Sequence, residues 1–391
     1  MMNFLYITRH FPPPVTDGMT RYADCLARGL KATGHGVIVL SGNPEEARVQ
    51  RKMMTCDGIP VYKSKAAESL KHRPQSWYGF SQRIESLSRK HHIDRIIIQH
   101  PYHGAPAMRV RDRLGVPVVY ISHTIAGLDR IFRCADRSFH YDAANEQRES
   151  ASMKRADAVI CLAESQRRQL AEIYSVPLER MHVVPTGVPL ETVELLPRTL
   201  SRLRRVKSGR KKLVLFLGRE SWEKGTDLLA EIILKVASMS PRAAFVLVGI
   251  ERRRWFEYLQ LPQTHVFAWM DRAELNALYQ LCDIIAVPSR RDSMPYALLE
   301  GMANGLVPVG SDVDGIKDVL REGNVGLTCP VQRSPGRVVV DTDCFSTKIL
   351  SVLENDRLQQ TLGENAKRLI EQKYCHEGQI HRFLAAVRHL S

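Results

Sequence analysis

Residues 288–305 follow an apolar, strand-like run and carry the most informative pattern of the sequence. They read Pro288-Ser289-Arg290-Arg291-Asp292-Ser293-Met294-Pro295-Tyr296-Ala297-Leu298-Leu299-Glu300-Gly301-Met302-Ala303-Asn304-Gly305. Pro295 is predicted to lie in the first turn of a helix, because proline is favoured where an N–H has no helical partner. Asp292 falls in the loop, and Glu300 falls about a turn and a half into that helix. Free amides at a helix N-terminus bind anions, so the stretch predicts a phosphate site flanked by two carboxylates.

Apolar, strand-like runs alternate with amphipathic, helix-like runs through the whole chain. This alternation is typical of parallel, doubly wound α/β sheets, and 391 residues suffice for two such cores. The predicted strands of the first half are Phe4–Thr8, Val37–Leu40, Ile93–Gln99, Val116–Ser122 and Ala158–Leu162, and those of the second half are 212–218, Ala244–Val248, Thr264–Ala268, Ile284–Val287 and Val307–Gly310.

The rhythm of strands and helices weakens after Gly187 and restarts at Lys212. The sequence therefore predicts one Rossmann-like domain over residues 1–190 and a second over 213–373. Between them lies a basic linker over 191–212, in which residues 198–212 hold eight basic and no acidic side chains.

The net charge of +14 lies in the first half and the linker. Such an excess attracts nucleic acid, anionic lipid or an anionic substrate, or it only solubilises the surface. No nucleic-acid-binding motif accompanies the charge, so we predict no nucleic-acid partner.

A peripheral contact with an anionic membrane is a further hypothesis for the first half and the linker. The aromatic residues Trp77, Tyr78 and Phe80 stand among lysines and arginines, the composition of an interfacial helix, although core packing would also explain them. No apolar run reaches the roughly 18 residues that span a bilayer, and the first residues read as a strand and not as a signal peptide. The eight cysteines form no Cys-x-x-Cys pair, which favours free thiols in a reducing cytoplasm, with the inner face of the membrane as the peripheral alternative.

The second half opens with a loop that carries two cations five positions apart. Arg219 and Lys224 follow the predicted strand ending at Gly218, and a helix is predicted after Gly225. Arginine can fork onto two phosphate oxygens and lysine acts as a point charge, so the pair suits a diphosphate. Two solvated surface cations are the alternative reading.

These two elements together resemble the retaining glycosyltransferases of the GT-B fold, in particular the family-four group. The stretch from Asp292 to Glu300 resembles the Glu-x7-Glu motif of that group, with Asp in place of the first Glu. The loop from Gly218 to Gly225 resembles its Gly-Arg-…-Lys-Gly element. The resemblance implies two Rossmann-like domains facing a central cleft, with a C-terminal helix over 374–391 that crosses back to the first domain.

The resemblance also implies roles for the second half of the chain. Glu300 matches the residue that holds the ribose hydroxyls, and Asp292 stands where the family's Glu touches the transferred sugar. Arg219 and Lys224 match the cations that bind the diphosphate and stabilise it as it leaves. The remaining predicted donor-binding residues belong to the loop and the helix start and are Ser293, Met294, Pro295 and Tyr296.

Two residues of the first half enter the site by the same resemblance. Gly18 matches the second glycine of the family's Gly-Gly, where Asp17 replaces the first. His123 follows a predicted strand at the end that faces a cleft in parallel sheets, where the family places a histidine near the donor sugar. A tight loop and a structural histidine are the alternative readings.

The predicted activity is transfer of a sugar, with retention of configuration, from a nucleoside-diphosphate sugar to the hydroxyl of a glycan, glycolipid or small metabolite. UDP and GDP are the favoured donor nucleotides. No cofactor is required and no metal is predicted, since Asp312-Val313-Asp314 is interpreted as a loop and not as an Asp-x-Asp metal motif. The departures at Asp292, at Asp17 and at Thr186, which replaces the Asn of the family's Pro-Asn-Gly-Val, leave a second hypothesis open, in which an inactive chain binds nucleotide sugars or serves as a partner subunit.

Overall fold

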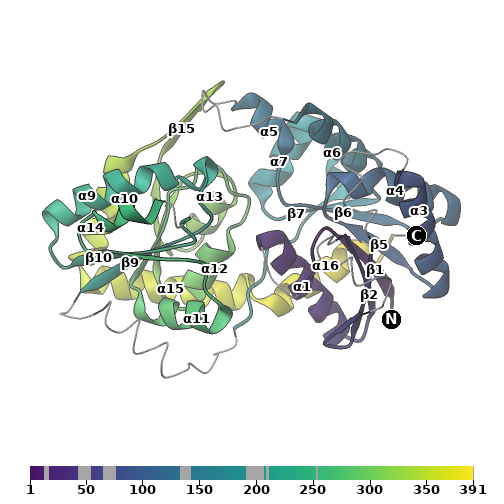
Figure 1. The fold of residues 1–391 in the computed structure, drawn as a ribbon, viewed down its shortest axis with the longest axis horizontal. Coiled ribbons are helices and arrows are strands. Elements are labelled where there is room, and N and C mark those ends of the chain that lie inside the picture. Colours follow the sequence, from purple (N-terminus) through teal and green to yellow (C-terminus); the bar gives the residue numbers. More distant parts are fainter. Residues whose placement is uncertain are drawn as a thin grey trace. The chain divides into compact units, whose positions relative to one another are not determined.

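The computed structural model describes residues 1–12, 17–42, 54–64, 76–132, 142–190, 207, 211–251 and 254–390. The chain forms two compact units, Met1–Thr186 with His376–Ser391, and Gly187–Cys375. Most of the predicted basic linker lies outside the described residues, as do Lys65, Lys71 and Arg73 of the region expected to be interfacial. Each unit is an α/β sandwich built on its own sheet, so the predicted fold class is confirmed (Figure 1).

The first unit contains an eight-stranded sheet in the order β3-β4-β2-β1-β5-β6-β7-β8. All neighbours are parallel except β3 and β4, which form an antiparallel hairpin at the edge. The strands are β1 (Asn3–Thr8), β2 (Gly36–Ser41), β3 (Met54–Cys56), β4 (Ile59–Lys63), β5 (Arg95–Ile98), β6 (Val118–Ser122), β7 (Ala158–Cys161) and β8 (Met181–Val183).

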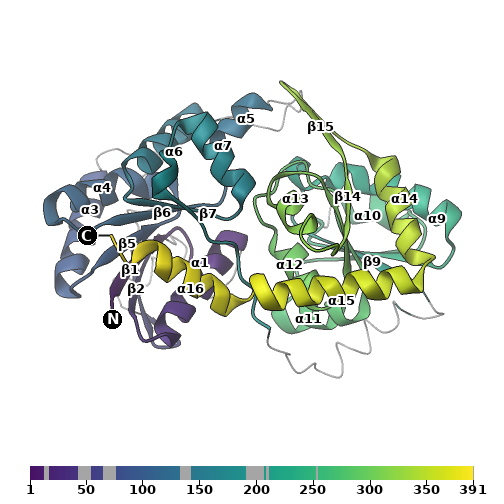
Figure 2. The same ribbon diagram turned by 180° about the vertical axis from the view of Figure 1, so that it is seen from behind.

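Helices cover both faces of this sheet. Helix α3 packs against α4, and α4 packs against α6. Separately, α16 packs against α1 (Figure 2). The helices are α1 (Gly18–Ala32), α3 (Ser76–Lys90), α4 (Pro101–Leu114), α5 (Ala126–Ile131), α6 (Ala143–Arg155), α7 (Glu164–Tyr174), the 3₁₀ turn η2 (Leu178–Arg180) and α16 (His376–Val387).

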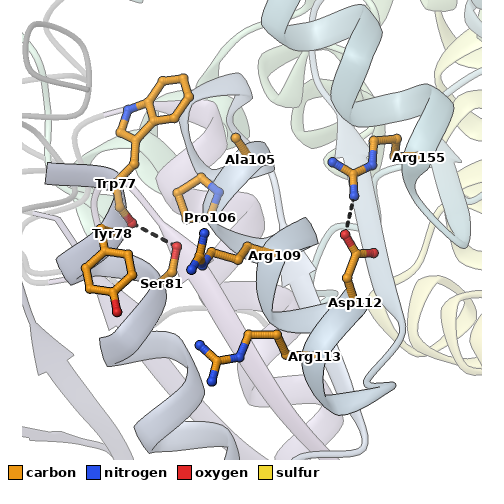
Figure 3. Close-up of a pocket in the computed structure, with 9 residues that line it drawn as sticks. All are labelled: Trp77, Tyr78, Ser81, Ala105, Pro106, Arg109, Asp112, Arg113 and Arg155. Carbon is orange, nitrogen blue, oxygen red and sulfur yellow. Dashed lines mark hydrogen bonds and ion pairs between the residues drawn. The ribbon is translucent and has the colours of Figure 1, made fainter. Parts of the chain in front are cut away.

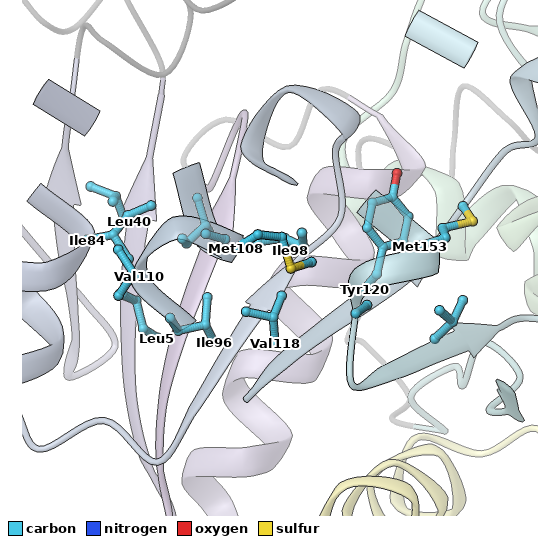
Figure 4. Packing of buried hydrophobic residues seen from close by; sticks show 14 of the residues in the cluster. Leu5, Leu40, Ile84, Ile96, Ile98, Met108, Val110, Val118, Tyr120 and Met153 are labelled. Atoms are coloured by element: carbon cyan, nitrogen blue, oxygen red, sulfur yellow. The ribbon is translucent and has the colours of Figure 1, made fainter. Parts of the chain in front are cut away.

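The core of the first unit consists of side chains from the buried strands and the facing helices. Leu5, Ile96 and Val118 come from three neighbouring strands and meet Val110 and Met108 of α4 (Figure 4). Strands buried on both faces read as continuous apolar runs, which is why the sequence pattern located them.

The second unit contains a six-stranded parallel sheet in the order β11-β10-β9-β12-β13-β14, and a separate antiparallel hairpin of β15 and β16. The strands are β9 (Lys212–Leu217), β10 (Ala243–Val248), β11 (Thr264–Phe267), β12 (Ile284–Val287), β13 (Val307–Ser311), β14 (Leu327–Cys329), β15 (Val331–Ser334) and β16 (Arg337–Val340). The helices are η3 (Trp222–Lys224), η4 (Thr226–Leu228), α9 (Leu229–Met239), α10 (Trp255–Leu259), α11 (Arg272–Leu281), α12 (Tyr296–Ala303), α13 (Asp314–Leu320), α14 (Thr342–Leu353) and α15 (Asp356–Lys373).

The last helix of the chain belongs to the first unit although it follows the second in sequence. Phe383 of α16 is fully buried and its ring lies 6.2 Å from that of Phe4 in β1. The ring nitrogen Nε2 of His376 lies 2.8 Å from the carbonyl oxygen of Cys25 in α1. The first unit is therefore assembled from both ends of the described chain.

Candidate active site

The carboxyl ends of the parallel strands gather the predicted residues of the second unit. Arg219 follows β9, Asp292 follows β12 and Asp314 follows β13, and these three strands lie in the same parallel sheet. Ligands of open α/β sheets bind at this edge, because the loops that leave the strands can be varied without disturbing the core. The predicted diphosphate-binding loop and the carboxylate motif therefore share one edge of the sheet.

Lys224 and Asp292 form an ion pair that joins the two predicted motifs. The side chains are 27% and 12% exposed, so the pair is largely but not fully shielded from bulk water. Gly225 makes this approach possible: its φ is +69°, and a Cβ there would lie 2.1 Å from the carbonyl oxygen of Pro288. Only glycine fits a left-handed conformation in such close contact with another backbone.

Arg219 lies in the same loop and is exposed to solvent. Its side chain is 67% exposed and its guanidinium is 3.5 Å from the carboxylate of Glu223. Exposed ion pairs of this kind contribute little to stability, so the guanidinium can turn toward an incoming anion at small cost.

Helix α12 begins at Tyr296, with Pro295 as the N-cap residue. The prediction that Pro295 lies in the first turn is wrong by one residue, because its ψ of 125° is extended and not helical. No side chain caps this N-terminus, so within the described residues the partial positive charge of the helix end faces the loop of Asp292 and Ser293. Met294 is 6% exposed, so it would reach a donor through its backbone only.

Glu300 is buried in α12 with both carboxylate oxygens engaged. Tyr279 donates a hydrogen bond of 3.0 Å to Oε2, and Arg272 lies 3.4 Å from Oε1. Both partners belong to α11, so the carboxylate is held in one orientation at the edge of the site. Sequence reasoning missed Tyr279 and Arg272, although a tyrosine and an arginine seven positions apart on an amphipathic helix share one face.

Two arginines, Arg290 and Arg333, bind the loops of the site through side-chain hydrogen bonds. Arg290 donates to both oxygens of Asp227 at 2.6 and 2.7 Å, and lies 4.9 Å from the centre of the Trp222 ring. Arg333 of β15 donates to the carbonyl oxygen of Arg290 at 2.6 Å and to Asp314 at 2.9 Å. Sequence reasoning missed both, because their partners lie far away in the chain.

Asp314 completes this frame by binding the loop of the carboxylate motif. Its Oδ2 accepts a hydrogen bond of 3.0 Å from the amide of Asp292. Burial lowers the pKa of the neighbouring Arg291 to about 10, although the carboxylates of Asp314 and Asp292 act in the opposite direction. A positive charge next to the loop makes the edge attractive to anions.

Neither carboxylate of the Asp312-Val313-Asp314 run is arranged for a metal. Asp312 pairs with Arg321 at 2.8 Å, and Asp314 pairs with Arg333. Over the described ranges, no group of three or more His, Cys, Asp or Glu side chains is placed to hold a metal ion.

The predicted residues of the first unit lie at the carboxyl edge of its own sheet. Gly18 is the first residue of α1, whose N-terminus is capped by Asp17 through a hydrogen bond of 2.8 Å to the amide of Thr20. His123 directly follows β6, and its Nε2 lies 3.1 Å from Oε1 of Gln99. Burial lowers the pKa of His123 to about 4, so the ring is neutral at pH 7.

A separate hollow of about 530 Å³ is lined mainly by residues of α3 and α4 (Figure 3). Arg109 lies over the ring of Tyr78 at 5.0 Å, and Arg155 pairs with Asp112 at 2.5 Å. The aromatic run expected at a membrane interface is divided here: Phe80 is fully buried, whereas Tyr78 is 54% exposed. No helix among the described residues is long and apolar enough to cross a membrane.

Comparison with known proteins defines the class. Residues 16–192 match the family model of Glycosyltransferase Family 4, and residues 198–369 match that of Glycosyl transferases group 1. The chain therefore belongs to the glycosyltransferases of the GT-B, family-four type, as the resemblance of its motifs predicted.

Individual relatives are distant. A D-inositol 3-phosphate glycosyltransferase from Nocardia farcinica is 26% identical over 57% of this chain and 52% of its own length. The enzyme of that name from a Nocardioides species is 24% identical over 89% of this chain and 80% of its own. The first of these matches thus spans about half of the relative.

Solved structures share the fold over the whole chain. Sucrose-phosphate synthase from Thermosynechococcus elongatus superposes with a TM-score of 0.83 at 18% identity, covering 100% of this chain and 99% of its own. HepE of Anabaena, solved in complex with UDP and glucose, gives a TM-score of 0.74 at 16% identity and covers 100% of both chains. At such identities the likeness establishes the fold alone.

Proposed function

We propose that the chain is a retaining glycosyltransferase that moves a sugar from a nucleoside-diphosphate sugar to a hydroxyl group. The observation that carries the proposal is the arrangement at the second sheet. There, the Lys224–Asp292 ion pair joins the loop after β9 to the loop that leads into the N-terminus of α12, and the buried carboxylate of Glu300 follows within that helix. HepE, a protein of this fold solved with UDP and glucose, supports a nucleotide-sugar donor.

The diphosphate would bind between the two cations and the end of the helix. Negative charge grows on the leaving diphosphate as the glycosidic bond breaks, and Arg219, Lys224 and the amides of α12 would stabilise it. Glu300, already oriented by Tyr279 and Arg272, would accept the ribose hydroxyls.

The ion pair between Lys224 and Asp292 links donor binding to the state of Asp292. A bound diphosphate would compete for Lys224, and Asp292 would then be free to accept a hydroxyl of the transferred sugar. Asp292 is shorter than the glutamate of the family motif by one methylene, so the donor sugar would sit closer to the loop than a glutamate would hold it.

The first unit would supply the acceptor site, and Gly18 and His123 are the predicted site residues that it carries. No side chain is assigned as a general base. In the proposed same-face attack, the acceptor oxygen bonds to the anomeric carbon as the leaving phosphate oxygen departs and takes the acceptor's proton. The name of the relatives, D-inositol 3-phosphate glycosyltransferase, points to phosphorylated polyols as one class of acceptor, and glycans, glycolipids and small metabolites form the wider class.

A thermal-shift screen against UDP, GDP, ADP and TDP and their sugars tests the donor. We expect one nucleotide to raise the melting temperature of the wild type, and Glu300→Ala to lose that shift because the ribose contacts are gone. Glu371→Ala, an exposed carboxylate of α15, is the control and should keep it. An undiminished shift in Glu300→Ala would contradict the role of Glu300.

A turnover measurement distinguishes an active transferase from an inactive chain that only binds the donor. With the donor identified, release of free nucleotide is measured against a panel of hydroxyl acceptors. Sugar transfer to one of them supports the enzyme. Tight donor binding without transfer to an acceptor that binds would instead identify a nucleotide-sugar-binding or partner subunit.

A peripheral membrane role rests on the hollow beside α3 and α4. Arg109, Arg113 and Arg155 line it together with Trp77 and Tyr78, a combination that suits anionic headgroups. Flotation with anionic and with neutral vesicles tests this role. We expect binding to the anionic vesicles only and a loss of binding in Arg109→Ala, and equal failure with both vesicles would remove the idea.

A further inference from the structure

Gln99 connects the two predicted site elements of the first unit. It follows β5, and its side-chain amide nitrogen donates to the hydroxyl of Thr8 at 2.6 Å and to the carbonyl oxygen of Met19 at 3.3 Å. Its amide oxygen faces the hydroxyl of Tyr6 at 2.9 Å and Nε2 of His123 at 3.1 Å. Met19 neighbours Gly18 at the start of α1, so one buried amide touches both the Gly18 segment and His123.

The orientation of the Gln99 amide is fixed by its neighbours. The hydroxyl of Thr8 donates its only proton to the carbonyl oxygen of His10 at 2.9 Å, so it can only accept from Gln99. The carbonyl oxygen of Met19 is likewise an acceptor. The nitrogen of the amide must therefore face these two groups, and its oxygen must face Tyr6 and His123.

This orientation determines the tautomer of His123. An amide oxygen cannot donate, so Nε2 of His123 must carry the proton. In a neutral imidazole the other nitrogen is then an acceptor. Nδ1 makes no hydrogen bond within the part of the chain that the structure describes, and the residue as a whole is half-buried.

We propose that Gln99 is a positioning residue that holds His123 as the Nε2–H tautomer, so that Nδ1 is left to accept a hydrogen bond from a hydroxyl of a ligand at this edge of the first unit's sheet. This inference rests on the proposed function for its ligand, but the tautomer itself is a property of the free protein. The neutral ring would discriminate in favour of a hydroxyl and against a purely anionic group at this position.

The groups around His123 come from several elements. Tyr22 of α1 presents its ring at 4.9 Å in an edge-on arrangement, and Tyr6 of β1 acts through Gln99. Asp17 favours the charged ring, whereas burial and His100 disfavour it more strongly. The balance leaves a neutral imidazole whose proton is placed by Gln99.

Nitrogen-15 NMR of histidine-labelled full-length protein tests the tautomer without any substrate. The resonances of His123 are assigned by comparison with His123→Gln. We expect Nε2 to be protonated and Nδ1 to be the unprotonated nitrogen at pH 7. A proton on Nδ1 would overturn the proposal even if the chain proves to be an active transferase.

The pH profile of kcat/KM tests the function of the tautomer. In Gln99→Glu, a carboxylate next to Nε2 favours the charged ring, which has no acceptor nitrogen. We expect the acid limb of the profile to move up by about one to three pH units. A merely structural role would lower activity at every pH without moving the limb.

Gln166→Glu is the matched control. Gln166 is a fully buried amide of the same unit that accepts from the amide of Leu162 at 2.6 Å and donates to the carbonyl oxygen of Ser122 at 3.1 Å, so the same chemical change is made at an amide whose hydrogen bonds go to the backbone and not to the ring of His123. We expect its acid limb to stay in place. An unmoved limb in Gln99→Glu would refute the positioning role. A chain that transfers no sugar from any donor would instead refute the proposed function, and the NMR result would still decide the tautomer.

Discussion

At the scale of single residues, the candidate site consists of charges that are neutralised in the free protein. Lys224 is paired with Asp292, and Glu300 with Arg272 and Tyr279. Such pairs keep the cations and carboxylates oriented before a donor arrives, and a bound diphosphate would take over Lys224 while a sugar hydroxyl donates to the released Asp292. The cost of binding is thereby limited to rearranging existing contacts.

Removing Lys224 should affect the transition state more than the fold. Lys224→Ala removes a charge that stabilises the leaving diphosphate, and we expect kcat to fall by about 10²–10³-fold. Lys235→Ala is the matched control, since Lys235 is similarly exposed and also ion-paired, with Glu231. Steady-state kinetics on the identified donor provide the measurement, and equal effects of the two variants would contradict the role of Lys224.

Glu149 should make stability dependent on pH. It accepts hydrogen bonds from Tyr174 and from the amide of Ala126, and burial raises its pKa from 4.5 to about 7. The folded state therefore binds more protons than the unfolded state between about pH 4.5 and 7. The contribution of Glu149 to the free energy of unfolding is therefore present at low pH and is lost as the pH rises through this range.

The variant Glu149→Gln isolates this effect. Relative to the variant, the wild type should lose roughly 3 kcal/mol of unfolding free energy between pH 5 and pH 8. Urea unfolding of both proteins at several pH values provides the measurement. Parallel pH curves for both proteins would show that Glu149 ionises freely in the folded state.

At the scale of secondary-structure elements, the strands and helices that carry the site were predictable, and their partners were not. Strands β9 and β12 and helix α12 follow from apolar runs and local signals. Strands β3, β4, β8 and β14 and the hairpin β15–β16 were missed because they are short or carry polar residues. Arg333 of that hairpin binds Asp314 through a contact that no local pattern encodes.

The loop between β9 and α9 depends on the conformation of Gly225. Gly225→Ala should destabilise the fold by more than about 1 kcal/mol, because φ is positive and the added Cβ meets the backbone of Pro288. Gly305→Ala separates the two causes, since its φ is +79° but its nearest atom, in Gly363, lies 3.9 Å from the added Cβ. Thermal unfolding should show the larger loss for Gly225→Ala, and equal losses would mean that the contact with Pro288 is easily relieved.

At the scale of the whole molecule, the resemblance of a few motifs predicted the architecture correctly. The Asp292–Glu300 stretch and the Arg219–Lys224 loop were sufficient because each joins a strand to a helix at a fixed edge of a sheet. What the motifs could not supply were Gln99, Tyr279 and Arg272, whose roles arise only when distant elements pack together. Gln99 orients His123, and Tyr279 and Arg272 orient Glu300.

The stability of the first unit should depend on the end of the chain. Phe383→Ala removes a fully buried ring from the contact between α16 and β1, and we expect a loss of about 3–5 kcal/mol. His381→Ala, on the exposed side of the same helix, is the control and should stay near the wild-type value. Denaturant unfolding measures both, and a small loss in Phe383→Ala would show that α16 is only loosely attached.

The place of α16 has a consequence for how the protein is made. The ribosome produces most of the first unit early, then the entire second unit, and only afterwards the helix that covers α1. Until that moment the apolar face that will receive Phe383 has no native cover. We therefore expect nascent chains halted before residue 376 to be prone to chaperone capture and degradation, even though every described strand of both sheets has already been synthesised.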